Sequence, residues 1–266
     1  MAAHRVTLVS DCIVTSPWPE AFARHVRVLI NPANVSLSGT QRAAFPRGGP
    51  VPPPVPPPAA AGQTARLWSW FRSEETRPVM DDLLYPAQAV DGLVHAEGTA
   101  KLRAALAKQP ILERRETGEH VRCRVGEAVL TAGAFNALPF DAIVHTVPPF
   151  WSQDGDGKDS VAEWETALRN CYRSSFRAAI DFARSCDASK SAVGLAIATP
   201  VLGSGARGAP MAPAARVLAD AVAELGGERV AEAATSELCL RVVVNPSIMA
   251  GDLAAVEAAV LGIMDK

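Results

Sequence analysis

Two short segments, far apart in the chain, carry residue types that suit a small anionic ligand. Asn31-Pro-Ala-Asn34 ends one apolar run, and Gly203-Ser-Gly-Ala-Arg-Gly208 ends another. The amides of Asn31 and Asn34 both donate and accept hydrogen bonds, which suits the hydroxyl groups of a sugar. The glycines allow backbone angles at which successive N–H groups face one anion, and a helix that starts near Pro213 adds its positive end. Together these segments predict a pocket for a nucleotide diphosphate, although an ordinary strand-ending turn accounts for Asn-Pro equally well.

The elements that must hold these segments alternate between strand-like and helical patterns. Each segment follows a β-rich run, at 26–30 and 192–198, so both loops should leave the same edge of a sheet. The other expected elements are strands at 5–9, 129–131, 142–147 and 238–244, and helices at 91–108, 161–184, 212–225 and 253–264. Gly226-Gly227 is expected to end the third of these helices. This alternation predicts an α/β fold with helical layers on both sides of a sheet.

Composition limits the class of protein and its partners. The 266 residues carry 26 basic and 28 acidic side chains, so nucleic acid is not an expected partner. No segment approaches the roughly 20 apolar residues of a membrane span, and residues 1–14 lack the apolar region of a secretory signal. The five cysteines form no C-x-x-C pair and the five histidines are isolated, so we expect no metal centre and no cofactor. These features predict a protein of a reducing compartment, the cytoplasm or the nucleus.

A proline-rich stretch interrupts the pattern. Residues 47–62 are rich in Gly and Pro and include Pro52–Pro54 and Pro56–Pro58, which favours an extended polyproline II conformation. We interpret residues 1–266 as a single domain with a Pro-rich insertion at about 40–89. The insertion could be a lid, a docking surface or an inert excursion, and its P-x-x-P strings leave an SH3 or WW ligand as a further alternative.

Two common nucleotide-binding signatures fit the chain poorly. Gly203–Gly208 formally matches G-x-G-x-x-G, but in a dehydrogenase this string opens the first βαβ unit and is answered by an acidic residue after the next strand. Here the string lies late in the chain, and Asn245 follows the next predicted strand. No G-x-x-x-x-G-K-[ST] string occurs, which excludes a P-loop. An oxidoreductase that uses a nicotinamide cofactor therefore rests on one weak motif.

Five blocks in order resemble the macrodomain family, the ADP-ribose-binding fold. The first two are Asn31–Gly39, which looks like the family's N-x-A-N-x-x-L-x-G loop, and Val90–His95, which looks like V-D-G-x-I-H. Three later blocks follow at 126–131, 143–148 and 203–210. The resemblance covers most of the chain outside the insertion, and it implies a three-layer α/β/α sandwich around a central mixed sheet.

The resemblance also implies roles for individual residues. Asp11 would accept a hydrogen bond from the adenine amino group, Asn34 would hold the distal ribose, and the loop at 204–206 would offer its N–H groups to the diphosphate. Asp91 stands where hydrolase members of the family carry their catalytic aspartate, and Asn34 is the second expected catalytic residue. The expected ligand contacts are Asp11, Cys12, Ile13, Asn31, Asn34, Gly203, Ser204, Gly205, Ala206, Arg207, Gly208 and Asn245.

Asp91 allows two interpretations. Its carboxylate could orient and partly deprotonate an attacking water as a general base. An aspartate at a helix start is equally typical of an N-cap, which accepts from free backbone N–H groups. His95 and His145 are expected to pack or to form hydrogen bonds rather than to react.

Departures from the family pattern leave three functions open. Gln88-Ala89 stand where glycines precede the aspartate, Arg207 replaces an aromatic residue, and Ala209 replaces a tyrosine. The first hypothesis is a mono-ADP-ribosyl hydrolase that frees acidic side chains of proteins and could also deacetylate O-acetyl-ADP-ribose. The second is a reader that binds ADP-ribose without cleaving it, and the third is the oxidoreductase. ADP-ribose and mono-ADP-ribosylated proteins are the expected partners of a chain that we expect to be monomeric.

Overall fold

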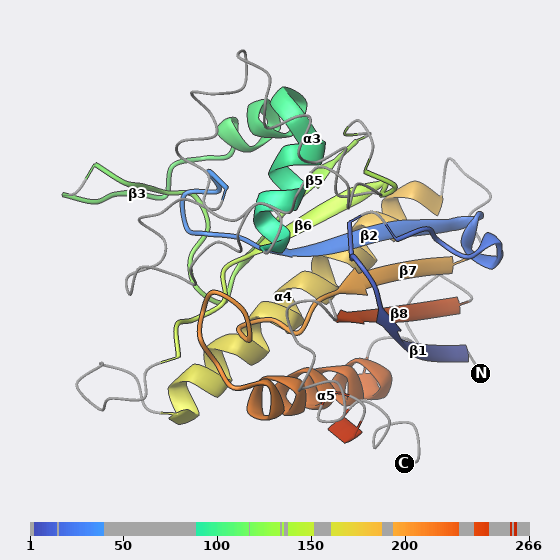
Figure 1. Cartoon of the computed structure of the whole chain (residues 1–266). Helices are drawn as coiled ribbons and strands as arrows, with labels where there is room; N and C mark the ends of the chain where they lie inside the picture. The colour runs from blue at the N-terminus through green and yellow to red at the C-terminus, as the bar shows by residue number, and fades with distance from the viewer. Residues whose placement is uncertain are drawn as a thin grey trace, which may run out of the picture.

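A six-stranded mixed sheet forms the centre of the computed structural model (Figure 1). The structure describes residues 3–14, 16–39, 89–116, 118–133, 135, 138–151, 161–187, 194–228, 237–244, 256, 258 and 259. The strand order is β1-β8-β7-β2-β6-β5, and every neighbouring pair is parallel except β5 with β6. The strands are β1 Ala3–Ser10, β2 His25–Pro32, β5 Ala128–Ala132, β6 Ala142–Thr146, β7 Gly194–Thr199 and β8 Glu237–Val244.

Helices cover both faces of this sheet. Helix α3 (Val90–Ala107) lies on one face, whereas α4 (Val161–Asp187) and α5 (Met211–Glu228) lie on the other (Figure 1). Strand β2 needs cover on both faces, because its side chains alternate between them and are apolar on each. Val28 is buried in the cluster that includes the inner sides of α4 and α5, and Leu29 is buried in the cluster that includes α3. The predicted three-layer α/β/α sandwich with a mixed sheet is confirmed.

The sequence predicted helix α5 but not the residue at which it ends. The expected stop at Gly226-Gly227 is wrong, because α5 continues to Glu228. Glycine in a helix costs about 1 kcal/mol relative to alanine, and this does not force a helix to end. Leu218 and Leu225 anchor α5 in the core just before the glycines, and this packing outweighs that local cost.

Some predictions fall partly or wholly outside the described residues. The insertion is among these, since nothing between Gly39 and Ala89 is described, and so is Asn245. The expected helix at 253–264 is described only at 256, 258 and 259, which are helical. The sequence patterns did not predict the short antiparallel pair β3 (Glu113–Arg114) and β4 (His120–Val121).

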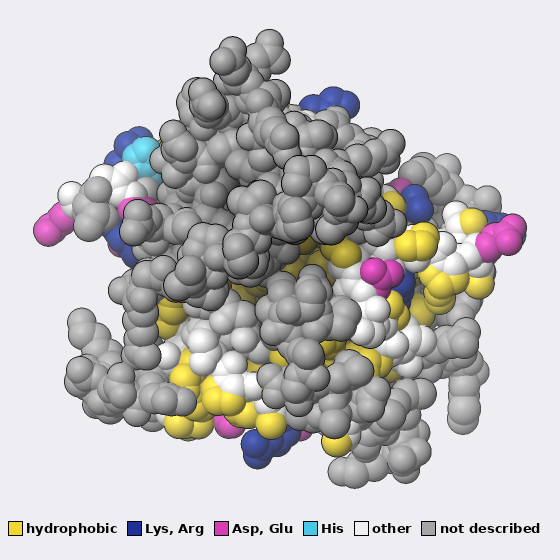
Figure 2. Space-filling model, in the orientation of Figure 1, with side chains coloured by type: hydrophobic (Ala, Val, Ile, Leu, Met, Phe, Trp, Pro, Cys, Tyr) yellow, Lys and Arg dark blue, Asp and Glu magenta, His cyan; other side chains and the backbone are white. Residues whose placement is uncertain are grey.

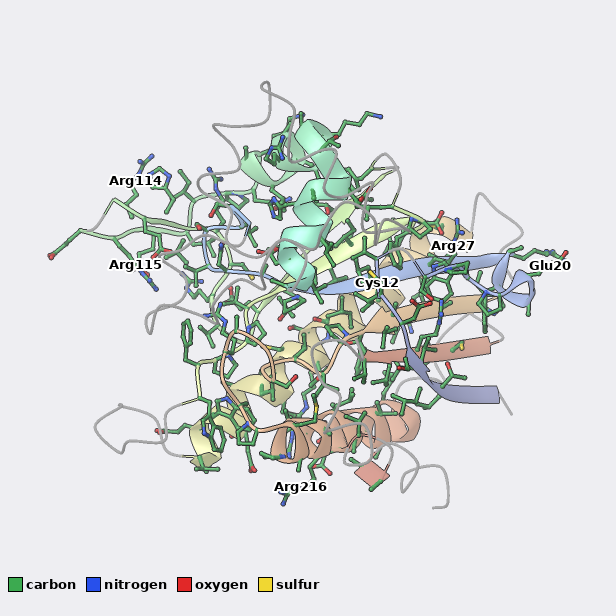
Figure 3. The ribbon with its side chains drawn as sticks, viewed as in Figure 1. Cys12, Glu20, Arg27, Arg114, Arg115 and Arg216 are labelled. Atoms are coloured by element: carbon green, nitrogen blue, oxygen red, sulfur yellow. The ribbon has the colours of Figure 1, made fainter. Side chains whose placement is uncertain are left out.

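Among the described residues that are visible in Figure 2, charges of one sign form no patch. On the face shown, the described Lys and Arg side chains are scattered among acidic and apolar ones. Arg114 and Arg115 lie on the β3–β4 hairpin, which projects away from the sheet (Figure 3). None of the helices in the described part of the chain has the length and apolarity needed to cross a bilayer.

The carboxyl ends of the parallel strands meet at one edge of the sheet. Asp11 follows β1 there, Ala33 and Asn34 follow β2, and the stretch 200–208 follows β7. Ligands of open α/β sheets bind at this edge. Helix α3 has a break at Thr99, so its first part, which carries Asp91 and His95, is a short segment of its own against this end of β2.

Candidate functional site

The two predicted ligand loops lie side by side. Strands β2 and β7 are direct neighbours, with Val28 opposite Ile197 and Leu29 opposite Ala198. The loops after these strands touch, because Arg207 Nη2 donates a hydrogen bond to the carbonyl oxygen of Ala33 at 3.2 Å. The expectation that both loops leave the same edge of the sheet is therefore confirmed.

The glycine-rich loop presents backbone N–H groups that the described residues do not use. Gly203 and Gly208 have φ of +85° and +78°, a region that favours glycine. The loop is closed by Gly208 N–H to the Gly205 carbonyl at 2.9 Å and Ala209 N–H to the Gly203 carbonyl at 3.0 Å. The amides at 204–206 have no acceptor among the described residues. This arrangement can receive an anion, with the N-terminus of α5 just beyond.

The Asn34 side chain organises its own loop. Its Oδ1 accepts from Ser36 Oγ at 3.0 Å and from Ser38 N–H at 3.1 Å, and its Nδ2 donates to the Gly39 carbonyl oxygen. Leu37 has a φ of +56° and is buried against the α3 side of the sheet. Asn34 thus holds a tight turn beside the glycine-rich loop.

Asp91 is not the N-cap of its helix. That position belongs to Ala89, which makes no side-chain capping bond, so the N-cap interpretation of Asp91 is wrong. The Asp91 carboxylate is buried, and its Oδ1 accepts a hydrogen bond from Asn31 Nδ2 at 2.8 Å. His95 Nε2, one helical turn later, lies 3.6 Å from the same oxygen. The structure therefore brings Asn31 and His95 to Asp91.

Both histidines near Asp91 favour the neutral form. Burial lowers the pKa of His95, the negative charge of Asp91 opposes this shift, and Arg103 adds to it. Burial also lowers the pKa of His145 to about 3, with a smaller contribution from His95. His145 Nδ1 lies 3.2 Å from Asn31 Nδ2. His145 is thus a hydrogen-bonding residue, as expected, but one directly linked to the partner of Asp91.

The predicted adenine residues lie further along the same edge. Asp11 is exposed, its N–H donates to the Val244 carbonyl at 3.2 Å, and its Oδ1 accepts from Cys12 N–H at 2.7 Å. Cys12 is half-buried and Ile13 is buried. In the strand order, β1 is two positions from β7 and three from β2. At about 4.8 Å per strand, this edge spans roughly 14 Å from Asp11 to the Asn34 loop.

A metal centre has no support among the residues described. They contain no group of three or more His, Cys, Asp or Glu side chains that could hold a metal ion. Among the described residues, this edge offers the buried Asp91 carboxylate, two histidines, the Arg207 guanidinium, side-chain amides and backbone N–H groups.

Comparison with known proteins places the chain in a family. The Macro domain family profile matches residues 80–218, just over half of the chain. The chain belongs to the macrodomain family. Its sequence is 34% identical over 105 residues to "O-acetyl-ADP-ribose deacetylase 2" of Pantoea vagans (strain C9-1), an alignment that covers 40% of this chain and 53% of that protein. It is 36% identical over 88 residues to "O-acetyl-ADP-ribose deacetylase 1" of the same organism, covering 33% and 43%. This macrodomain therefore spans about half the length of the curated relatives that it matches.

Solved macrodomains share the fold. An Oceanobacillus iheyensis macrodomain with ADP superposes with a TM-score of 0.54 at 19% identity, covering 98% of this chain and 92% of that one. A Trypanosoma brucei macrodomain in complex with ADP gives a TM-score of 0.50 at 18% identity, covering 96% and 69%. At such identities the likeness is one of fold.

Arg207 also contacts the segment that follows β6. Its guanidinium carbon lies 4.1 Å from the centre of the Phe150 ring, and Trp151 N–H donates to the Arg207 carbonyl at 2.9 Å. The sequence had suggested that this guanidinium could stack on the ribose or pair with phosphate. In the structure the guanidinium lies over Phe150 and donates to the Ala33 carbonyl, and its contact with a ligand stays a prediction.

Sequence reasoning missed the part that Asn31 plays. The expected contact of Asn31 with the ligand stays a prediction, but the structure adds that this residue is buried and that its amide engages Asp91 and His145. One signal was available, because a histidine inside an apolar strand such as 142–147 must be buried and buried polar groups need partners. The identity of those partners depends on which strands are neighbours.

Proposed function

We propose that this macrodomain binds ADP-ribose and hydrolyses carboxylic esters of its distal ribose. The observation that carries the proposal is the Asp91 carboxylate, buried and held by Asn31 at the end of β2, next to two loops joined at the carboxyl edge of the sheet. The printed names of the two Pantoea vagans relatives support an activity of this class.

The proposed ligand lies along the edge described above. Asp11 receives the adenine amino group, and the amides at 204–206, which meet no acceptor among the described residues, receive the diphosphate. The turn organised by Asn34 holds the distal ribose, with its hydroxyls exchanging hydrogen bonds with the Asn34 amide. This order follows the strands from β1 through β7 to β2.

Asp91 is the proposed general base. A water molecule attacks the ester carbonyl carbon, and a new C–O bond forms while Asp91 takes a proton from the water. The bond between the carbonyl carbon and the ribose oxygen then breaks, and the proton passes to that oxygen. The products are ADP-ribose and a carboxylic acid, which ionises. Holding the diphosphate and ribose still supplies much of the rate by positioning.

Two substrates belong to this ester class. O-acetyl-ADP-ribose is the one named for the relatives. The finer proposal is that the chain also removes ADP-ribose from acidic side chains of mono-ADP-ribosylated proteins, because an ADP-ribosyl glutamate or aspartate presents the same ester to Asp91. The modified protein is then the macromolecular partner.

A non-catalytic reader is the second candidate. The observation that favours it is the Asn34 amide, which is already engaged by its own turn at 36–39. The oxidoreductase alternative is weaker, since the G-x-G-x-x-G string follows β7 rather than opening the first βαβ unit.

Replacement of one carboxylate tests the proposal. Asp91→Asn should lower the turnover of O-acetyl-ADP-ribose and of an automodified protein by about two to four decades, the usual contribution of a general base. Asp141→Asn is the matched control, because the Asp141 carboxylate also accepts a hydrogen bond from a β2 residue, the Arg27 N–H, but precedes β6, at the opposite edge.

Product release by chromatography and ADP-ribose affinity by calorimetry separate the candidates. If Asp91→Asn turns over substrate as fast as the wild type, Asp91 is not the general base. Tight binding of ADP-ribose by the wild type, with neither substrate cleaved, would establish the reader instead.

A further inference from the structure

A series of hydrogen bonds crosses three neighbouring strands beneath Asp91. From the carboxylate it runs to Asn31 on β2 at 2.8 Å, then to His145 on β6 at 3.2 Å, then to Thr131 on β5 at 2.9 Å. Thr131 Oγ1 in turn donates to the Ile143 carbonyl at 3.4 Å. We call Thr131, His145 and Asn31 the relay.

Strand register places the relay. Asn31 is directly opposite His145 in the parallel pair of β2 and β6. Thr131 is opposite Ile143 in the antiparallel pair of β5 and β6, so it lies diagonally next to His145 on the same face. All three side chains are buried, on the face that α3 covers.

The hydrogens of the Asn31 amide and of the neutral His145 ring can be assigned so that each hydrogen bond of the relay has one donor and one acceptor. Asn31 Nδ2 has two hydrogens, one for Asp91 Oδ1 and one for His145 Nδ1. His145 Nδ1 must then be an acceptor, so the proton of the neutral ring lies on Nε2 and is donated to Thr131 Oγ1. The low pKa of His145 agrees with a ring that stays neutral.

The unused atom of Asn31 shows that this orientation is selected. Asn31 Oδ1 is buried and has no hydrogen-bond partner among the described residues. Turning the amide over would set this oxygen against the Asp91 carboxylate, two acceptors with no hydrogen between them, and would remove the donor that both Asp91 and His145 Nδ1 meet. The observed orientation therefore engages both hydrogens, while the oxygen meets no donor among the described residues.

We propose that Asn31 is the positioning residue for Asp91, and that Thr131, acting through His145, holds the Asn31 amide in the orientation that donates to the carboxylate. This inference rests on the proposed hydrolase function for its kinetic consequence. Loss of the Thr131 hydroxyl leaves His145 Nε2–H without an acceptor and favours the tautomer with the proton on Nδ1. That proton would face the Asn31 amide, turn it over and displace Asp91.

Three threonine variants test the relay at a distance from substrate. Thr131→Val removes the hydroxyl and keeps the shape, whereas Thr131→Ser restores it. Thr146→Val is the matched control. Thr146 lies on β6 and, like Thr131, is buried and donates to a backbone carbonyl, that of Glu127 at 2.8 Å, but it lies on the other face of the sheet.

The kcat and KM of these variants should show whether Thr131 positions Asp91 or only stabilises the fold. Thr131→Val should lower kcat about tenfold with KM and ADP-ribose affinity nearly unchanged, since a small misplacement of a catalytic group affects the chemical step most. Thr131→Ser should recover most of kcat, and Thr146→Val should keep it. If Thr131→Val and Thr146→Val have the same kcat, the positioning inference is overturned.

Nitrogen NMR of histidine-labelled wild-type protein tests the arrangement without any turnover. The relay requires a His145 ring with its proton on Nε2 and none on Nδ1, and a shift of that proton toward Nδ1 in Thr131→Val. A wild-type spectrum with the proton on Nδ1 would overturn the inference. Absence of wild-type turnover would instead refute the hydrolase proposal, and the spectrum alone would then decide the relay.

Discussion

Arg207 is expected to tie together the two loops of the proposed ligand site. It belongs to the loop after β7, and its Nη2 donates to Ala33 in the loop after β2 at 3.2 Å. Its guanidinium also stacks on Phe150, which follows β6, at 4.1 Å from the ring centre. We therefore predict that Arg207→Ala weakens both the fold and the ligand site.

The size of the effect follows from these contacts. A hydrogen bond from a charged donor contributes about 1.5 to 3 kcal/mol, and the 3.2 Å separation favours the lower value. A cation–π contact with a partly exposed ring adds about 0.5 to 1 kcal/mol. Burial of the charge, which lowers the pKa of Arg207, offsets part of this gain because the guanidinium loses hydration. The expected loss is about 1 to 2 kcal/mol, or roughly 2 to 8 °C in Tm.

Urea unfolding and calorimetry with ADP-ribose measure both effects. Arg207→Lys should resemble Arg207→Ala, because an ammonium group lacks the planar donors and stacks less well. Arg173→Ala is the control, since Arg173 pairs with Glu224 at 2.7 Å on the exposed surface, where an ion pair contributes about 0 to 1 kcal/mol. ADP-ribose affinity should fall about tenfold in Arg207→Ala, equivalent to about 1.4 kcal/mol. If Arg207→Ala is no more destabilising than Arg173→Ala and binds ADP-ribose normally, the bridge between the loops has no energetic role.

Three further predictions concern two glycines of the glycine-rich loop and the stability of the protein in acid. Gly208→Ala should lower the free energy of unfolding by about 1 to 2 kcal/mol, because its φ is +78°. Gly205→Ala adds a methyl group that meets nothing within 4 Å, so it should keep the Tm but weaken ADP-ribose binding measured by calorimetry; unchanged affinity would place the diphosphate elsewhere. Unfolding in urea should become easier as the pH falls below about 6.5, because burial lowers the pKa of His95 and holds that of His145 at about 3, so the unfolded state binds protons that the folded state does not. Each histidine contributes at most about 1.4 kcal/mol per pH unit over this window, and an equally steep decline in His145→Gln would contradict the assignment to that ring.

Much of the fold could be predicted from local patterns. The apolar runs at 26–30 and 192–198 became β2 and β7, and the amphipathic pattern at 91–108 became α3. The end of α5 could not be predicted in this way. Local glycines favour a stop there, but packing of the helix against the sheet supplies more free energy than two glycines remove.

In the candidate site, too, local sequence predicted one part and tertiary structure decided the other. Glycines at 203 and 208 take positive φ because of their own chemistry, and the sequence therefore determined a loop able to turn its N–H groups toward an anion. The part played by Asn31 was decided by tertiary structure alone. A single asparagine can face a ligand or a neighbour, and only the pairing of β2 with β6 puts His145 opposite it while α3 brings Asp91 to the same amide. Hydrogen-bond partners this far apart in the chain depend on strand register, which no local pattern of residues specifies.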